Sequence, residues 1–238
     1  MSLNRFQCSA MAGAAFCASL AAAETLHFRS DLAGAWIDIS GAGTALNLAA
    51  DDVAGIDSPV GNAVFPAGQC WVGNNGAVGF GANNTLPPVT QPIPSTQLFG
   101  GSQSAVPFAT DIGDDQGNVF WDVVPRPGPS RGSVLVVQWH DHRFVGSNDT
   151  GRFQLQIFSD PGPDHIYAQF LYNDIQQPFP DGGEIATIGY QNGSAGFNDV
   201  QWSYHVAGAV ANGTVLSLVP EPTAGLLLGL LGVLLRRR

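Results

Sequence analysis

The chain has 238 residues, with 19 acidic and 9 basic side chains and a formal net charge of −10. Residues 24–219 contain five arginines, no lysine and eighteen acidic residues, so this stretch alone has a net charge of −13. Such a charge repels nucleic-acid phosphates and anionic lipid headgroups, which argues against a nucleic-acid-binding protein and a peripheral membrane protein. The negative charge favours a soluble module that binds cations or neutral glycans.

The N-terminus has the features of a secretory signal peptide. Arg5 precedes a mildly apolar run, and the alanines at 21–23 suit signal peptidase, which cuts after small residues. We therefore predict that residues 1–23 form a signal segment and that the chain is exported.

The three cysteines are divided between this signal segment and the rest of the chain. Cys8 and Cys17 would be removed with the signal, so Cys70 remains alone and no intramolecular disulfide can form. Because Cys70 stands beside Trp71 in an apolar run, we expect it to be a small buried side chain rather than a reactive thiol.

Short apolar stretches separated by Gly, Asn and Pro predict one all-β domain over residues 24–218, without an amphipathic helix. Asn-Gly at 75–76, between two such stretches, is typical of a hairpin. About ten short strands fit an antiparallel β-sandwich or jelly roll. We expect strands near residues 36–40, 44–48, 69–73, 77–80, 118–124, 133–139, 151–158, 165–172, 185–190, 200–206 and 214–218.

The residue patterns of two of these strands also predict which of their faces are buried. Residues 133–139 are almost continuously apolar, which indicates a central strand covered on both faces. Residues 151–158 alternate, so three apolar side chains should point inward while Gln154 and Gln156 point outward.

Residues 83–104 are rich in Pro, Gly, Ser, Thr and Asn, which predicts a long loop over the domain surface. Leu98 and Phe99 are the side chains that could anchor it to the core. A linker between two domains is the alternative.

The tail begins with Val219-Pro220-Glu221-Pro222, where two prolines fix φ and remove backbone donors, so a helix can start only after them. Residues 223–235 carry no charge and would reach about 20 Å as a helix. A hydrocarbon core is about 30 Å thick, so this segment predicts a transient rather than a comfortable span of the inner membrane.

Arg236, Arg237 and Arg238 close the chain and would stay on the cytoplasmic side as membrane-stop charges. This arrangement resembles the PEP-CTERM sorting signal of exported proteins in Gram-negative, exopolysaccharide-producing bacteria. The resemblance implies that an exosortase-type membrane enzyme recognises residues 219–238, cuts near Glu221 and leaves the mature protein at the cell surface or released. A retained single-pass anchor is the alternative.

A looser resemblance extends over the domain. The hairpin at 74–80 and the strands at 137–139, 153–157, 166–172 and 186–192 follow one another as in nidogen-like and related β-sandwich modules of large secreted bacterial proteins. The likeness implies an adhesive or matrix-associated role rather than a catalytic one.

Oxygen ligands are concentrated in the loop at 111–118. Asp111, Asp114, Asp115 and Asn118 supply three carboxylates and an amide, and Ca²⁺ prefers such ligands at flexible spacing. The spacing departs from that of an EF-hand, so a solvated acidic turn is the alternative. Calcium is the first of two candidate metal ions in this sequence, and we expect no other cofactor.

A second candidate metal site is the pair His140 and His142, after the predicted central strand. Alternate residues of a strand share a face, so both imidazoles could meet one Zn²⁺. The sequence identifies no third ligand, and a polar strand end is the alternative.

Exposed aromatic rings would serve a carbohydrate-binding module, because sugar rings stack on them. The candidates are Trp121, Tyr172, Tyr190, Trp202 and Tyr204, with core packing as the alternative.

The single Gly-x-Ser-x-Gly match, at residues 128–132, lies between two predicted strands rather than between a strand and a helix, and no His-Glu-x-x-His motif occurs, so no catalytic residue is proposed. We expect a non-catalytic exported protein associated with extracellular polysaccharide or a biofilm matrix. A carbohydrate-binding module is the first alternative and a secreted hydrolase the second.

Overall fold

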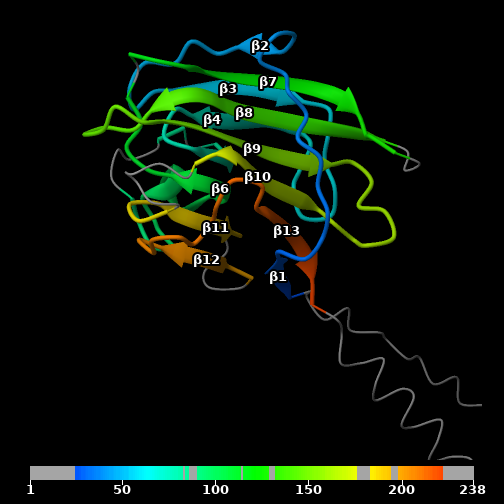
Figure 1. Cartoon of the computed structure of the whole chain (residues 1–238). Helices are drawn as coiled ribbons and strands as arrows, with labels where there is room; N and C mark the ends of the chain where they lie inside the picture. Colours follow the sequence, from blue (N-terminus) through cyan, green and yellow to red (C-terminus); the bar gives the residue numbers. More distant parts are fainter. Residues whose placement is uncertain are drawn as a thin grey trace, which may run out of the picture.

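The computed structural model describes residues 25–82, 84–85, 90–113, 115–128, 132–175, 183–193 and 198–221. Within these ranges the chain forms thirteen strands in two antiparallel sheets, with one short 3₁₀ turn, η1 (Leu98–Gly101). The sheets pack face to face (Figure 1), which confirms the predicted all-β antiparallel sandwich. The predicted signal segment, the apolar residues 223–235 and the terminal arginines lie outside the described residues.

The two sheets differ in size. In spatial order the seven-stranded sheet contains β1 (Leu26–Arg29), β13 (Val215–Pro220), β10 (Ala168–Asp174), β9 (Thr150–Phe158), β8 (Ser133–Arg143), β7 (Asn118–Pro125) and β2 (Thr44–Ala45). The six-stranded sheet contains β12 (Val200–Tyr204), β11 (Thr187–Gln191), β6 (Gln103–Ala109), β5 (Ala77–Phe80), β4 (Gly68–Gly73) and β3 (Val53–Ser58).

The main core fills the space between the two sheets. It consists of the inward-pointing side chains of strands in which buried and outward residues alternate. In β9 these are Phe153, Leu155 and Ile157, all buried as the alternation predicts. Trp139 of β8 stacks on Phe153 with ring centroids 4.9 Å apart. Cys70 is also buried in this core, which confirms its expected role, and burial raises the pKa of its thiol to about 12.

Strand β8 is interior to its sheet, with β7 on one side and β9 on the other, as its apolar sequence predicts. Leu135 and Val137 face the main core, whereas Val134 and Val136 belong to a second apolar cluster together with Ile39. The outer face of this sheet is therefore covered as well, by the segment that contains Ile39.

The proline-rich stretch is anchored to the six-stranded sheet. Leu98 and Phe99 of η1 are buried and pack with Ala77 and Val106, as the sequence suggested. A Cβ added to Gly79 of β5 would lie 2.3 Å from Cγ of Phe99, so the strand needs glycine beneath this ring. The described part of this loop thus packs on the same sandwich.

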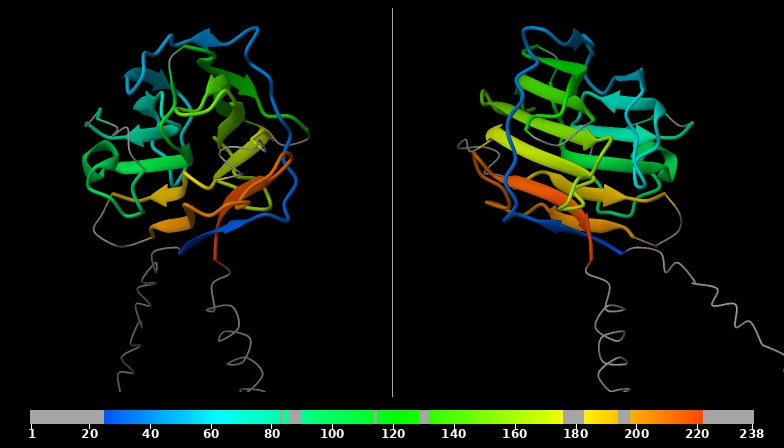
Figure 2. Two further views of the ribbon diagram at one scale, coloured as in Figure 1. Left: turned by 60° about the vertical axis from the view of Figure 1, so that its left-hand side comes forward. Right: turned by 90° about the vertical axis from the view of Figure 1, so that its right-hand side faces the viewer.

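Both ends of the sandwich lie at one edge. Strand β1 pairs with β13, with Leu26 opposite Pro220, and the Glu221 N–H donates to the Thr25 carbonyl at 2.6 Å. Val219 is buried and Pro220 is half-buried, so the first two residues of the predicted sorting motif complete the last strand. The chain enters and leaves the sandwich side by side (Figure 2).

Candidate functional site

Residues 33–39, which we call the strap, cross the outer face of the seven-stranded sheet in an extended conformation (Figure 1, blue). The sequence predicted paired strands at 36–40 and 44–48. The first of these predictions is wrong, because the strap pairs with no strand, and of the second only Thr44–Ala45 forms a strand, paired with β7. Side chains of the sheet bind the strap backbone instead.

These side chains are four glutamines, which we call the glutamine row: Gln138 of β8, Gln154 and Gln156 of β9, and Gln169 of β10. Gln138 stands opposite Gln154 in the strand register, and Gln156 stands opposite Gln169. All four are at most 3 % exposed. Gln154 and Gln156 do point away from the main core, as predicted, but the strap covers them.

The glutamine row binds the strap through its backbone. Three of the glutamines each donate to one strap carbonyl, and these carbonyls are two residues apart, which matches the two-residue period of an extended chain. The donor Nε2 atoms of Gln169, Gln156 and Gln154 lie 3.0, 2.9 and 2.6 Å from the carbonyl oxygens of Ala33, Ala35 and Ile37. At the far end the Ile39 N–H donates to Gln138 Oε1 at 3.0 Å.

The glutamines also bind one another, which fixes the orientation of their amides. Gln154 Nε2 donates to Gln138 Oε1 at 2.7 Å, and Gln156 Nε2 donates to Gln154 Oε1 at 3.0 Å. Gln169 Nε2 donates to Ser217 Oγ at 2.9 Å. Within the described residues, the Oε1 atoms of Gln156 and Gln169 accept no hydrogen bond.

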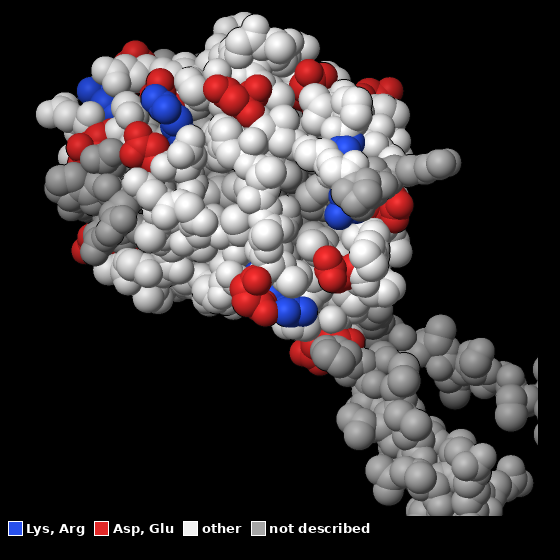
Figure 3. Space-filling view, turned by 45° about the vertical axis from the view of Figure 1, so that its right-hand side comes forward, with Lys and Arg blue, Asp and Glu red and all other residues white. Residues whose placement is uncertain are grey.

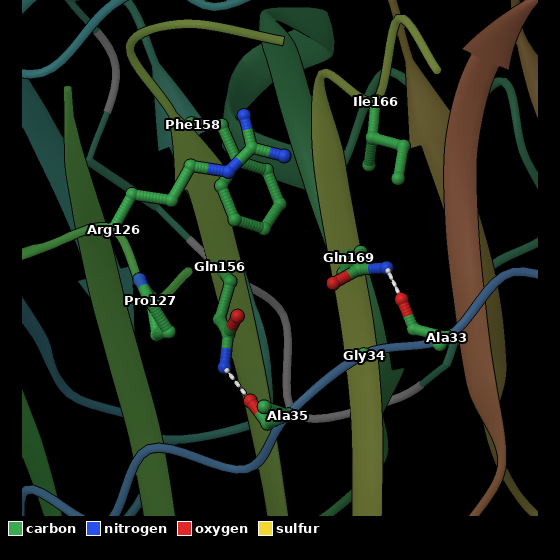
Figure 4. A pocket seen from close by; sticks show the side chains of 9 residues that line it. All are labelled: Ala33, Gly34, Ala35, Arg126, Pro127, Gln156, Phe158, Ile166 and Gln169. Carbon is green, nitrogen blue, oxygen red and sulfur yellow. Dashed lines mark hydrogen bonds between the residues drawn. The ribbon is translucent and has the colours of Figure 1, made fainter. Parts of the chain in front are cut away.

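A cavity of about 310 Å³, which we call the strap pocket, opens to solvent where the strap passes these two amides. It lies between the strap, the turn after β7 and the outer faces of β9 and β10 (Figure 4). Its lining residues are Ala33, Gly34, Ala35, Arg126, Pro127, Gln156, Phe158, Ile166 and Gln169.

Arg126 supplies the positive charge of the strap pocket. Its guanidinium carbon lies 4.5 Å from the centre of the Phe158 ring, a cation–π arrangement, and its Nη1 donates to the Asp160 carbonyl. No described carboxylate lies within 4.0 Å of this guanidinium. The other described arginines, Arg29, Arg143 and Arg152, each pair with an aspartate.

The geometry of the strap pocket thus sets a cation against two neutral acceptors. Figure 4 shows the guanidinium over the Phe158 ring, and the carbonyl ends of Gln156 and Gln169 directed toward the space between these two side chains. Phe158 and Ile166 add apolar surface. The strap pocket can therefore bind a small polar ligand, but it holds no described acid, base or nucleophile placed for catalysis.

The strap carries one acidic side chain, Asp38. Gln138 Nε2 donates to its Oδ1 at 3.0 Å, and the backbone N–H and hydroxyl of Ser40 donate to the same atom. These hydrogen bonds, the one from Gln138 first, lower the pKa of Asp38 to about 2. The carboxylate is consequently ionised throughout the physiological range and holds the end of the strap.

The predicted histidine pair is separated by a bulge. Asp141 has φ 54°, and the β8–β9 register shifts between Trp139 and His142, so the alternation on which a shared face depends is broken. His140 is half-buried, with Nδ1 2.8 Å from Gln138 Nε2. His142 is 2 % exposed, and neither of its ring nitrogens makes a hydrogen bond to a described residue.

Burial lowers the pKa of His142 to about 4, and the nearby backbone carbonyls of Gly113 and Asn118 offset only part of this effect. An unfolded histidine has a pKa near 6.5, so between these values the unfolded chain binds more protons than the folded one. The stabilisation from the neutral buried ring is complete above pH 6.5 and is lost as the pH falls toward 4.

Two of the four predicted calcium ligands have other partners. Asp115 pairs with Arg143 at 2.5 Å, and Asn118 forms two hydrogen bonds with Asn47. Burial, together with the charge of Asp51, raises the pKa of Asp111. Asp114 lies outside the described residues. In the described part of the chain, no three His, Cys, Asp or Glu side chains are grouped to hold a metal.

The five aromatic candidates divide by burial. Tyr172 and Tyr190 are each 1 % exposed in the main core, and Trp121 is half-buried against it. Burial raises the pKa of both tyrosines. Trp202 and Tyr204 are 38 % and 36 % exposed on edge strand β12, with the buried Ser203 between them. Of the five candidates, Trp202 and Tyr204 are the two whose rings are exposed to solvent, as stacking on a sugar requires.

Among the residues that the structure describes, no helix reaches the length and apolarity needed to span a bilayer.

The fold is a small antiparallel β-sandwich, with the strap pocket on the outer face of its seven-stranded sheet. A protein family described as NIDO related matches residues 28–226, from β1 to beyond the last strand. The chain belongs to this NIDO-related family, which agrees with the nidogen-like resemblance of its strands. No curated protein and no solved structure matches it.

Sequence reasoning missed the strap pocket. The available signal was the placement of uncharged glutamines at outward positions of three neighbouring strands, where surface strands commonly carry charged residues. Nothing in the sequence indicates that residues 33–39 cover them.

Proposed function

We propose that this chain is an exported, non-catalytic cell-surface protein whose β-sandwich binds extracellular polysaccharide. The observation that carries the proposal is the pairing of β1 with β13, which brings the two chain ends to one edge. After removal of the signal segment, the mature chain would begin at the same edge of the sandwich from which the sorting tail leaves after Glu221. Membership of the NIDO-related family supports an extracellular location.

The last strand bears on where a processing enzyme would cut. Val219 and Pro220 belong to β13, and the Glu221 backbone binds Thr25. A cut before Val219 would remove paired residues from the last strand, whereas a cut after Pro220 leaves β13 complete. Processing by an exosortase-type enzyme near Glu221 is compatible with an intact sandwich.

The sorting part of the proposal is tested by mass spectrometry of the protein recovered from the cell surface. We expect no peptides from residues 223–238, and we expect Glu221→Gln to leave the precursor in the inner membrane. Glu184→Gln, at an exposed turn, is the matched control and should be processed normally. Surface protein that retains its C-terminal peptides would contradict the proposal and favour a retained anchor.

The binding part is tested by incubating the immobilised full-length chain with polysaccharide from a producing strain. Retention above that of a protein of equal charge is expected. A second version of this function places binding on the exposed rings of Trp202 and Tyr204, and the double alanine variant tests it separately. Equal retention by both proteins would rule out polysaccharide binding.

A further inference from the structure

Arg126 is an unusual residue for this chain. Acidic residues outnumber basic ones about two to one, yet its guanidinium has no described carboxylate within 4.0 Å. Arg126 binds the backbone carbonyl of Asp160, whereas the Asp160 side chain accepts from the Gly162 N–H at 3.0 Å. Stacking on Phe158 and the bond to the Asp160 carbonyl hold the cation at the pocket. A fixed arginine of this kind suits a carboxylate.

The opposite wall accepts hydrogen bonds and cannot donate them. The Nε2 atoms of Gln156 and Gln169 are bound to the Ala35 and Ala33 carbonyls and to further acceptors. Turning either amide over would set two oxygen atoms against each other, so each Oε1 must face the pocket. A ligand must therefore bring donors to this wall, and hydroxyl groups are the neutral donors that fit.

The volume and the apolar lining of the strap pocket further restrict the class of ligand that it can bind. A volume of about 310 Å³ is at the lower end of ligand sites, roughly 300–1,000 Å³, and suits one sugar unit rather than a length of polymer. Phe158 and Ile166 offer apolar contact to the C–H groups of a ring. Figure 3 shows the charged groups on the face it presents as scattered among large uncharged areas.

We propose that the strap pocket binds a sugar unit that carries a carboxylate, of the uronic-acid class, with its carboxylate on Arg126 and its hydroxyls on Gln156 and Gln169. The ligand class rests on the proposed function, since it names the part of an extracellular polysaccharide that the sandwich would recognise. An anionic sugar departs from the expectation drawn from net charge, which favoured cations or neutral glycans.

The test is titration calorimetry of the full-length chain in detergent micelles with glucuronate, its methyl ester and glucose. Glucuronate should bind at least about tenfold more tightly than the other two, equivalent to about 1.4 kcal/mol, because only it presents a charged carboxylate. Inorganic phosphate, an anion without a sugar ring, should bind as weakly as glucose. Raising the salt concentration should weaken glucuronate binding and leave the binding of glucose and of the methyl ester unchanged.

Variants locate the binding. Arg126→Gln should lose at least about tenfold in affinity for glucuronate and Arg126→Lys should lose less, whereas Arg143→Gln, which removes an arginine paired with Asp115, should bind as the parent does. If Arg126→Gln does not fold, Arg126→Lys and the comparison of glucuronate with its methyl ester still test whether the carboxylate binds at Arg126. Equal affinities for glucuronate and its ester, binding that survives Arg126→Gln, or no glucuronate binding would each overturn the proposal.

The outcomes also separate this inference from the proposed function. Polysaccharide retention that persists in Arg126→Gln would keep the proposed function and remove the strap pocket as its site. Glucuronate binding without polysaccharide retention would keep the pocket and remove the proposed function.

Discussion

Gln154 connects the strap to the sheet, and its replacement by methionine measures that connection. Its Nε2 donates to Ile37 O at 2.6 Å and to Gln138 Oε1 at 2.7 Å, while its Oε1 accepts from Gln156 Nε2 at 3.0 Å and from the Ile37 N–H at 3.4 Å. Methionine keeps the length and removes the amide. The substitution removes all four of these hydrogen bonds. Ile37 is the one partner that loses both of its hydrogen bonds to the glutamine row.

The expected loss follows from the three shorter bonds. A buried hydrogen bond contributes about 1 kcal/mol net, and a buried group left without a partner costs about 1–3 kcal/mol. The half-buried backbone of Ile37 can regain water in part, so we expect Gln154→Met to lower the free energy of unfolding by about 2–4 kcal/mol. For a domain of this size this corresponds to a melting temperature lower by about 5–15 °C.

Urea unfolding and amide hydrogen exchange provide the measurement. Exchange should accelerate at Ile37 and Ile39, whose N–H groups bind the glutamine row. Gln69→Met is the matched control, because Gln69 is exposed on β4 and its change should stay within about 0.5 kcal/mol. A Gln154→Met variant as stable as this control, with unchanged exchange at both isoleucines, would show that the glutamine row does not hold the strap.

Two further changes test the core. The protein should lose about 2–3 kcal/mol of unfolding free energy between pH 7 and pH 4.5 through His142, a loss that His142→Phe should abolish in urea titrations at both pH values. An equal pH dependence in the variant would refute the buried neutral ring as its source. Gly79→Ala should destabilise by about 1–3 kcal/mol because its Cβ collides with Phe99, whereas Gly41→Ala, with nothing within 4 Å, should be neutral in thermal melts. Equal melting temperatures would contradict the close packing.

Much of the sandwich could be predicted because strand patterns are local. Alternation placed the inward and outward residues of β9 correctly, and the continuous apolar run identified β8 as an interior strand. The hairpin at 74–76 and the anchoring of Leu98 and Phe99 also follow from neighbouring residues. Each of these features depends on side chains a few positions apart.

The errors arose where distant segments meet. Ile37 binds Gln154, 117 positions further along the chain, and no local pattern distinguishes a strap held by side chains from a strand held by a ladder. His140 and His142 were expected on one face, but the bulge at Asp141 interrupts the alternation. Such a bulge depends on the neighbouring strand, so the sequence of β8 alone could not predict it.

The sequence by itself determined the class of fold, most of the strands that face a core but not β1, β3 or β6, and the acidic, lysine-free composition that argues against nucleic-acid partners. Only the tertiary structure decided the order of the strands, the joining of the two ends at β1 and β13, and the strap pocket. The physical reason is that periodicity is a property of one segment. The meeting of Gly34, Arg126 and Gln169 depends on the register between strands and on a buried amide network that forms only when the sheet is complete.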